Sequence, residues 1–286
     1  MCKMKKTAFF TMDVESFSEI SCLRETPRAE YDDFRIEYAI DDYLDLLEKY
    51  GIKATFFVLC SSLEHTREYL RRAVKEGHEI ALHGLTHELP AQINKEELKK
   101  QLFKGKELLE KEFGTKITGY RAPCFAVTDE VLEVIEELGF EYDSSRHDVP
   151  MKYYTATANF DGFKEVSGGI LQRRGFYEIP PCQVKTFGGT MSVSGGGYMR
   201  LAPYSVVLGG LKKFLKASDY YVFYCHPAEI FTGKPPNLKG VSLLNSYFIK
   251  AGRKNFLNHT ENIIKVLQDN GYSFSTMCDF LKNKDK

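Results

Sequence analysis

Short apolar strands alternate along this chain with segments of helical periodicity, and that alternation limits the fold more than any other feature. The runs Thr7–Asp13, Ala54–Cys60 and Glu79–His83 are rich in β-branched and aromatic residues, which favours strands. Between them, apolar residues recur at three- and four-residue steps in residues 36–50 and 63–76, each followed by a glycine, which predicts two helices with glycine C-caps. Strands separated by helices predict a parallel sheet covered by helices.

The same pattern continues toward the carboxyl end. Asn94 and Thr128 suit helix N-caps, and a last helix is predicted around residues 258–270. Further strands are predicted at GYRAP (119–123), FEYDS (140–144), YYVFYCHP (220–227) and YSFST (272–276). Residues 146–204 are rich in Gly, Pro and aromatic residues, so we expect substrate loops there around one strand at YEIP (177–180). Because α/β barrels of roughly 250 residues fold as one unit, we predict a single domain over residues 1–286.

Charge and cysteine usage limit the compartment and the partners. Lys+Arg and Asp+Glu both number 39, so the chain has no net field that would attract nucleic acid or an anionic membrane surface. The apolar run near the start is too short for a signal peptide or a membrane span, which predicts an unexported protein without a membrane span. Seven cysteines without a CxxC pair are typical of reduced thiols, so we expect a cytoplasmic protein.

Polar residues follow the predicted strands at the ends where functional groups of parallel α/β proteins gather. They are Asp13, Glu15, His83, His87, Arg121, Asp143 and His226. Imidazole and carboxylate groups bind divalent cations, a second carboxylate can act as a base, and a further histidine can protonate a leaving group. The set therefore predicts a hydrolytic metal site.

The two histidines of HGLTH are the clearest candidates for metal ligands. His83 and His87 stand four residues apart, so a helical turn would bring both rings to one side. Residue 84 is Gly, which excludes the HExxH pattern of metalloproteases. Ordinary explanations exist for each residue, such as a loop cap for Asp13 or a surface ion pair for Arg121. The metal site is favoured because three independent strand ends carry the residue types that one site needs.

The segments FTMDVE, HGLTH, RAP and FYCHP occur in this order and resemble the signature motifs of the polysaccharide deacetylases, the NodB-homology or carbohydrate esterase 4 family. The resemblance covers Thr7 to about Phe280. It implies a distorted (β/α) barrel of seven or eight strands that removes acetyl groups from sugars with a divalent metal, zinc in the first place and Co²⁺, Ni²⁺ or Mn²⁺ as alternatives. The segments YEIP and GGGYMRLAPY resemble the branch found with bacterial exopolysaccharide synthesis.

The resemblance also implies roles for individual residues. Asp13 matches the general base that takes a proton from a metal-activated water, and His83 and His87 match metal ligands. Arg121 matches the residue that orients the base, and His226 matches the general acid. The backbone N–H of Cys124 matches the oxyanion donor.

Two departures from the family pattern bear on these roles. The usual T-F-D-D-G places the metal aspartate directly after the base, but residue 14 is Val and the next acid is Glu15. Side chains two apart on a strand share a face, so Glu15 is the predicted third ligand, and an exchange of roles with Asp13 stays open. The chain has no Trp, so Asp143 or the SGGGYMRL loop is expected to replace the tryptophan motif beside the acid.

The predicted substrate is an acetylated glycan or glycan precursor, bound by Pro123, Tyr198 and Arg200. Two alternatives are a metal-dependent amidase that acts on a small cyclic amide and a catalytically inactive glycan-binding barrel. A cysteine hydrolase is disfavoured because the neighbours Cys225 and His226 point to opposite faces of a strand. The kind of acetyl group and the oligomeric state are not readable from the sequence.

Overall fold

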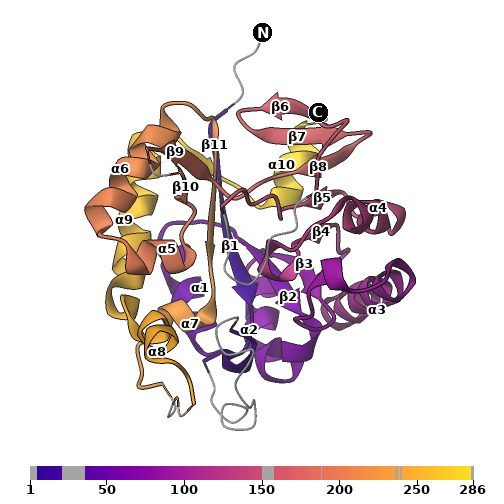
Figure 1. The fold of residues 1–286 in the computed structure, drawn as a ribbon, viewed down its shortest axis with the longest axis horizontal. Helices are drawn as coiled ribbons and strands as arrows, with labels where there is room; N and C mark the ends of the chain where they lie inside the picture. Colours follow the sequence, from indigo (N-terminus) through magenta and orange to yellow (C-terminus); the bar gives the residue numbers. More distant parts are fainter. Residues whose placement is uncertain are drawn as a thin grey trace.

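The computed structural model describes residues 5–20, 36–149, 158–187, 189–235, 238 and 240–284. Its centre is a ten-stranded sheet, ordered β11-β1-β2-β3-β4-β5-β8-β7-β6, with β12 paired to β1 (Figure 1). The strands are β1 (Thr7–Val14), β2 (Thr55–Leu59), β3 (Glu79–Gly84), β4 (Gly119–Tyr120), β5 (Tyr142–Asp143), β6 (Lys164–Ser167), β7 (Ile170–Arg173), β8 (Phe176–Glu178), β11 (Tyr220–Cys225) and β12 (Ser273–Phe274). The path from β11 to β8 is parallel, whereas β7 and β6 join it antiparallel. The sheet curls into half a barrel, which confirms the predicted α/β fold of the distorted barrel type.

Helices follow the strands as the alternation predicted. They are α1 (Ala39–Lys49), α2 (Leu63–Lys75), α3 (Lys95–Phe113), α4 (Asp129–Glu137), α5 (Gly196–Leu201), α6 (Tyr204–Leu215), α7 (Pro227–Ile230), α8 (Leu243–Lys250), α9 (Phe256–Asp269) and α10 (Met277–Lys284). The side chains of Asn94 and Thr128 accept hydrogen bonds from the backbone N–H groups of Glu97 and Val131, so both predicted N-caps are confirmed. Gly114 ends α3 in the left-handed conformation that favours glycine. In the described part of the chain, every helix is too short or too polar to cross a bilayer.

The core lies under the central strands. All eight residues of β1 and all six of β11 are buried, as expected for strands that helices cover. Phe10 and Phe223 stack across the β1–β11 pair with ring centroids 4.9 Å apart. Gly119 on β4 lies so close to the ring of Tyr142 that no side chain fits there. This close approach holds β4 against β5.

The prediction of loops around one strand in residues 146–204 was wrong. The described residues of this segment hold strands β6, β7 and β8, a separate hairpin of β9 (Gln183–Thr186) and β10 (Gly189–Ser192), and helix α5; residues 150–157 and 188 lie outside the described residues. Strands β6, β7 and β8 are only three or four residues long, and β6 and β7 are partly exposed whereas β8 is buried, so none of them carries a long apolar run. The glycines that suggested loops form the tight turns between them, with positive φ at Gly168, Gly169 and Gly175.

The single-domain prediction for residues 1–286 stays a prediction. It is supported by the parallel pairing of β1 with β11, because the register joins Thr7–Met12 to Tyr220–Cys225 across most of the chain length. The helices after β11 return to the same sheet through β12, which pairs with the start of β1.

Candidate metal centre and active site

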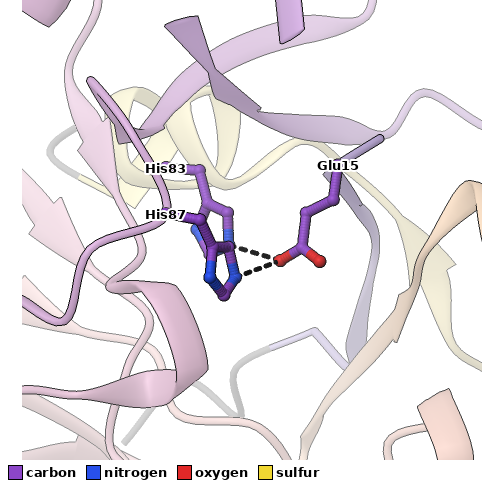
Figure 2. A group of neighbouring side chains, drawn as sticks. All are labelled: Glu15, His83 and His87. Atoms are coloured by element: carbon purple, nitrogen blue, oxygen red, sulfur yellow. Dashed lines mark hydrogen bonds and ion pairs between the residues drawn. The ribbon is translucent and has the colours of Figure 1, made fainter. Parts of the chain in front are cut away.

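Three buried side chains from two strand ends converge on one point. Glu15 follows β1, His83 lies on β3 and His87 lies in the next loop. The Nε2 atoms of His83 and His87 lie 3.1 and 2.9 Å from the same oxygen, Oε1 of Glu15 (Figure 2). One ligand atom from each residue lies within 4.8 Å of the others. The structure thus brings together the three residues that were predicted to bind metal.

The hydrogen bonds of His83 show why a cation fits here. Its Nδ1 lies 2.7 Å from the carbonyl oxygen of Arg121, and because a carbonyl only accepts, Nδ1 carries the proton. In a neutral ring, Nε2 then presents a lone pair to the Glu15 carboxylate, so two acceptors face each other. A divalent cation between them removes this repulsion, and a backbone carbonyl behind a ligating histidine is a common support for metal ligands. The donor set fits a divalent metal.

A buried ion pair holds Asp13 beside this centre. Nη1 of Arg121 donates to Oδ1 of Asp13 at 2.6 Å and to Oγ1 of Thr11 at 2.9 Å. The other guanidinium nitrogens donate to the carbonyl and hydroxyl oxygens of Ser144 at 3.0 and 2.8 Å, and the cation lies over the Phe57 ring. Arg121 is completely buried, so its charge is compensated by these partners rather than by water. These contacts hold Oδ1 of Asp13 in place.

His226 approaches the other oxygen of Asp13. It is the N-cap residue of α7, directly after β11, and its Nε2 lies 3.8 Å from Oδ2 of Asp13. Its Nδ1 lies 3.3 Å from Oε2 of Glu229. Burial lowers the pKa of His226, because it disfavours the charged ring. The hydrogen bond that the ring donates to Glu229 and the charges of Glu15, Glu229 and Asp13 have a larger, opposite effect and raise this pKa to about 9. The imidazole is therefore protonated at neutral pH.

Glu229 is a site residue that sequence reasoning missed. One of its carboxylate oxygens, Oε2, also accepts the backbone N–H of His226, and Nε of Arg200 donates to the other at 3.3 Å. Burial raises the pKa of Glu229, but the hydrogen bond and charge of the His226 imidazole, together with the charge and hydrogen bond of Arg200, hold this pKa below its usual value. The signal was present in the sequence HPAE, because Glu229 stands three residues after the N-cap residue His226, which is the spacing of a capping box.

The predicted site residues surround a cavity of about 250 Å³. Its wall includes the carboxylates and imidazoles named above and the side chains of Tyr198, Arg200 and Cys124. Pro123 is buried in the short helical turn Pro123–Phe125 and is not among the lining residues, so its predicted substrate contact stays a prediction. Tyr198 and Arg200 are placed where such contacts can occur.

Two further groups from the sequence analysis, Asp143 and the Cys225 thiol, do not line the cavity. Asp143 is completely buried and accepts a hydrogen bond from Ser145; it does not line the cavity, whereas Tyr198 and Arg200 of the SGGGYMRL segment do. The thiol of Cys225 points to the carbonyl of Thr11, and burial raises its pKa well above the usual value. A Cys225 thiolate is thus disfavoured, as the sequence argument expected.

The fold and the site define an α/β half-barrel protein with a candidate divalent metal centre at the carboxyl ends of its strands. Residues 30–142 match the sequence model of the polysaccharide deacetylases, and residues 153–282 match a domain of unknown function, DUF3473. These matches make residues 30–142 similar to a polysaccharide deacetylase domain and residues 153–282 similar to a DUF3473 domain. Membership of the whole chain in the polysaccharide deacetylase family, and in its exopolysaccharide branch, stays a prediction.

Curated relatives match only part of the chain. A peptidoglycan deacetylase of Helicobacter pylori is 34% identical over 112 residues, which are 39% of this chain and 38% of the relative. The peptidoglycan-N-acetylmuramic acid deacetylase PdaC of Bacillus subtilis is 35% identical over 101 residues, 35% of this chain and 22% of that protein. The chain thus spans well under half the length of these relatives.

Solved structures match over almost the whole chain. A structure assigned to the polysaccharide deacetylases, from Mycobacterium smegmatis, aligns with a TM-score of 0.64 at 20% identity and covers 99% of this chain and 91% of that one. A CE4 family pseudoenzyme from Bacillus anthracis aligns with a TM-score of 0.55 at 14% identity and covers 97% and 66%. At these identities the likeness establishes the fold, and the pseudoenzyme demonstrates that the fold alone does not imply activity.

Proposed function

We propose that this chain is a metal-dependent hydrolase that removes acetyl groups from N-acetylated sugars of a polysaccharide or glycan precursor. The observation that carries the proposal is the cavity in which Glu15, His83 and His87 converge beside Asp13 and His226. The relatives named above as peptidoglycan deacetylases support an acetylated glycan as the substrate. The exopolysaccharide branch and a cytoplasmic location stay predictions from the sequence.

Glu15, His83 and His87 are the residues that would hold the cation. Two imidazoles and one carboxylate leave a coordination position open in a tetrahedral site, as catalytic zinc sites do. Zinc is therefore the first choice, with Co²⁺, Ni²⁺ and Mn²⁺ as alternatives. When bound, the cation supplies Lewis acidity, which polarises an acetyl carbonyl and lowers the pKa of water.

Asp13 acts as the general base in this proposal, and Glu15 rather than Asp13 is the carboxylate ligand. Oε1 of Glu15 faces both Nε2 atoms, whereas Asp13 is held by Arg121. The guanidinium holds Oδ1 of Asp13 at 2.6 Å, while Oδ2 faces Nε2 of His226 at 3.8 Å. Asp13 can then accept a proton from a water molecule that attacks the carbonyl carbon.

His226 acts as the general acid. Its Nε2 faces Asp13 across the cavity and its Nδ1 is held by Glu229, so a proton on Nε2 is available to the leaving sugar nitrogen. We assign the oxyanion contact to the backbone N–H of Cys124, a residue in the wall of the same cavity. A preorganised donor of this kind contributes about 3 kcal/mol to transition-state stabilisation.

Acetate release tests the proposal. The purified chain is assayed on a panel of acetylated glycans, with and without a chelator, together with Asp13→Asn, His83→Ala and His226→Ala. His65→Ala is the matched control, because His65 lies on α2 away from the cavity. We expect metal-dependent release that the three site variants lose and the control keeps. Activity that survives the chelator contradicts the mechanism, and metal binding without release from any glycan favours the inactive glycan-binding barrel.

A further inference from the structure

Helix α8 presents an apolar surface to solvent beside the mouth of the cavity. Leu243 is 92% exposed, Leu244 57% and Tyr247 59%; we call these three residues the α8 patch. Leu243 and Tyr247 stand four residues apart and Leu244 and Tyr247 three, so their side chains share one face of the helix. Neighbouring exposed apolar side chains of this size mark a surface that contacts a membrane or another protein.

The segment around the α8 patch is strongly basic although the chain as a whole is neutral. Residues 230–260 contain four lysines and one arginine and no Asp or Glu. Lys250 and Lys254 follow the α8 patch directly and are exposed, and Lys234 precedes it and is exposed too. Exposed lysines therefore gather in this segment although the chain has no net charge.

The α8 patch is connected to the candidate active site by Arg200. Its Nη1 donates to the carbonyl oxygens of Phe248 and Ala251 at the end of α8, at 2.8 and 2.6 Å. Its Nε donates to Glu229, the carboxylate behind His226. Phe248 and Ile249 line the cavity itself, so the two sides of α8 face the cavity and the solvent. Figure 1 shows α8 at the lower edge of the molecule, close to α7.

We propose that the α8 patch and its lysines dock the protein on an anionic lipid surface. Apolar side chains at the tip of a basic segment are the pattern of interfacial membrane contact, in which apolar groups enter the headgroup region and cations meet anionic lipids. Aliphatic Leu243 and Leu244 have no polar atoms for sugar hydroxyls, which argues against a glycan as the occupant. A second copy of this chain would bring like charges together, which argues against a dimer.

The consequence concerns how substrate reaches the cavity. A membrane bound at α8 lies next to the cavity mouth, so a glycan carried by that membrane would be delivered there. This consequence rests on the proposed function, whereas the docking itself does not.

Vesicle sedimentation tests the docking without any assay of hydrolysis. The full chain is mixed with vesicles of phosphatidylcholine and phosphatidylglycerol, or of phosphatidylcholine alone, and the bound fraction is measured after centrifugation. We expect binding to the anionic vesicles that added salt weakens. Leu243→Ser with Leu244→Ser is expected to reduce the partition coefficient about tenfold or more. A similar loss is expected for Lys250→Glu with Lys254→Glu.

Helix α3 provides matched controls for both double variants. Phe103 and Leu108 are 52% and 39% exposed there, and Lys100 and Lys104 are exposed on the same helix. Phe103→Ser with Leu108→Ser, and Lys100→Glu with Lys104→Glu, are expected to bind vesicles like the unaltered chain. Thermal melts check that all variants fold.

Three results would overturn the docking proposal. The first is an unaltered chain that stays in the supernatant with anionic vesicles. The second is an equal loss of binding in the α3 controls. The third is a dimer in light scattering that Leu243→Ser with Leu244→Ser dissociates while vesicles bind no protein, which would assign the α8 patch to contacts between copies.

Discussion

Replacement of Glu229 by Gln removes the negative charge behind His226 and leaves its shape. Glu229 occupies the third position of the α7 capping box, where Gln is equally suited to accept the backbone N–H of His226. The hydrogen bond to Arg200 can persist as well. Any change in the titration of His226 in Glu229→Gln therefore reports the charge and not the loss of the turn.

The expected magnitude follows from the contacts of His226. Burial lowers its pKa, and Glu229, through its hydrogen bond and charge, is foremost among the groups that raise it to about 9. An opposite charge at this distance changes a pKa by about one to three. We therefore expect the pKa of His226 to be lower by at least about one in Glu229→Gln, which corresponds to about 1.4 kcal/mol. A cation bound to Glu15 would cancel the effect of that carboxylate on His226, so we expect the pKa of His226 in the metal-loaded protein to lie below 9. The difference in this pKa between the unaltered chain and Glu229→Gln is expected to persist.

The pH dependence of kcat/KM measures this difference. The general acid must be protonated, so activity falls on the alkaline side as His226 loses its proton. In Glu229→Gln this limb should move to lower pH by about one unit or more. Glu19→Gln is the matched control, because Glu19 holds the same capping-box position in the turn Phe17–Glu19. An alkaline limb that is unchanged in folded Glu229→Gln would refute the assignment of Glu229 and His226 as a coupled pair.

Further predictions concern the metal, the thiol, the sheet and pH. His83→Ala should lower zinc affinity by about 100-fold or more in calorimetry and abolish the zinc-induced rise in Tm, since one of three ligands is lost. Cys124→Ser should keep kcat/KM within about threefold, because only its backbone is assigned a role; a large loss would indicate thiol chemistry. Gly119→Ala should lower the free energy of unfolding by about 1–3 kcal/mol in urea titrations, because a Cβ overlaps the Tyr142 ring. In metal-free protein the raised pKa of His226 adds stability that is fully present below pH 6.5 and is lost as the pH rises through about 9, and thermal melts across this range should show the loss.

The parts of the fold that could be predicted are those in which one local pattern decides. The buried strands β1, β2 and β11 are apolar, and helices α3 and α4 carry side-chain N-caps at Asn94 and Thr128. Residues 146–204 carry no such pattern, because β6 and β7 are short and partly exposed and the buried β8 has only three residues. Their pairing depends on the position of β5 in three dimensions, which no local sequence window contains. Helices α6 and α8 were not predicted either: α6 contains two consecutive glycines, which weaken a helix prediction, and α8 has only eight residues.

The candidate site was more predictable than the fold around it, because strand direction places its groups. Parallel strands end at one edge of a sheet, so Asp13, His83 and His226 had to approach one another once three strands were recognised. The sequence could not show which of two buried carboxylates, Asp143 or Glu229, pairs with His226. Asp143 and Glu229 are both buried carboxylates after strands, but Asp143 pairs with Ser145 whereas Glu229 reaches Nδ1 of His226. Pro227 begins α7 directly after His226, and the capping box of this helix places Glu229 three residues after His226, so the proposed acid carries its own carboxylate.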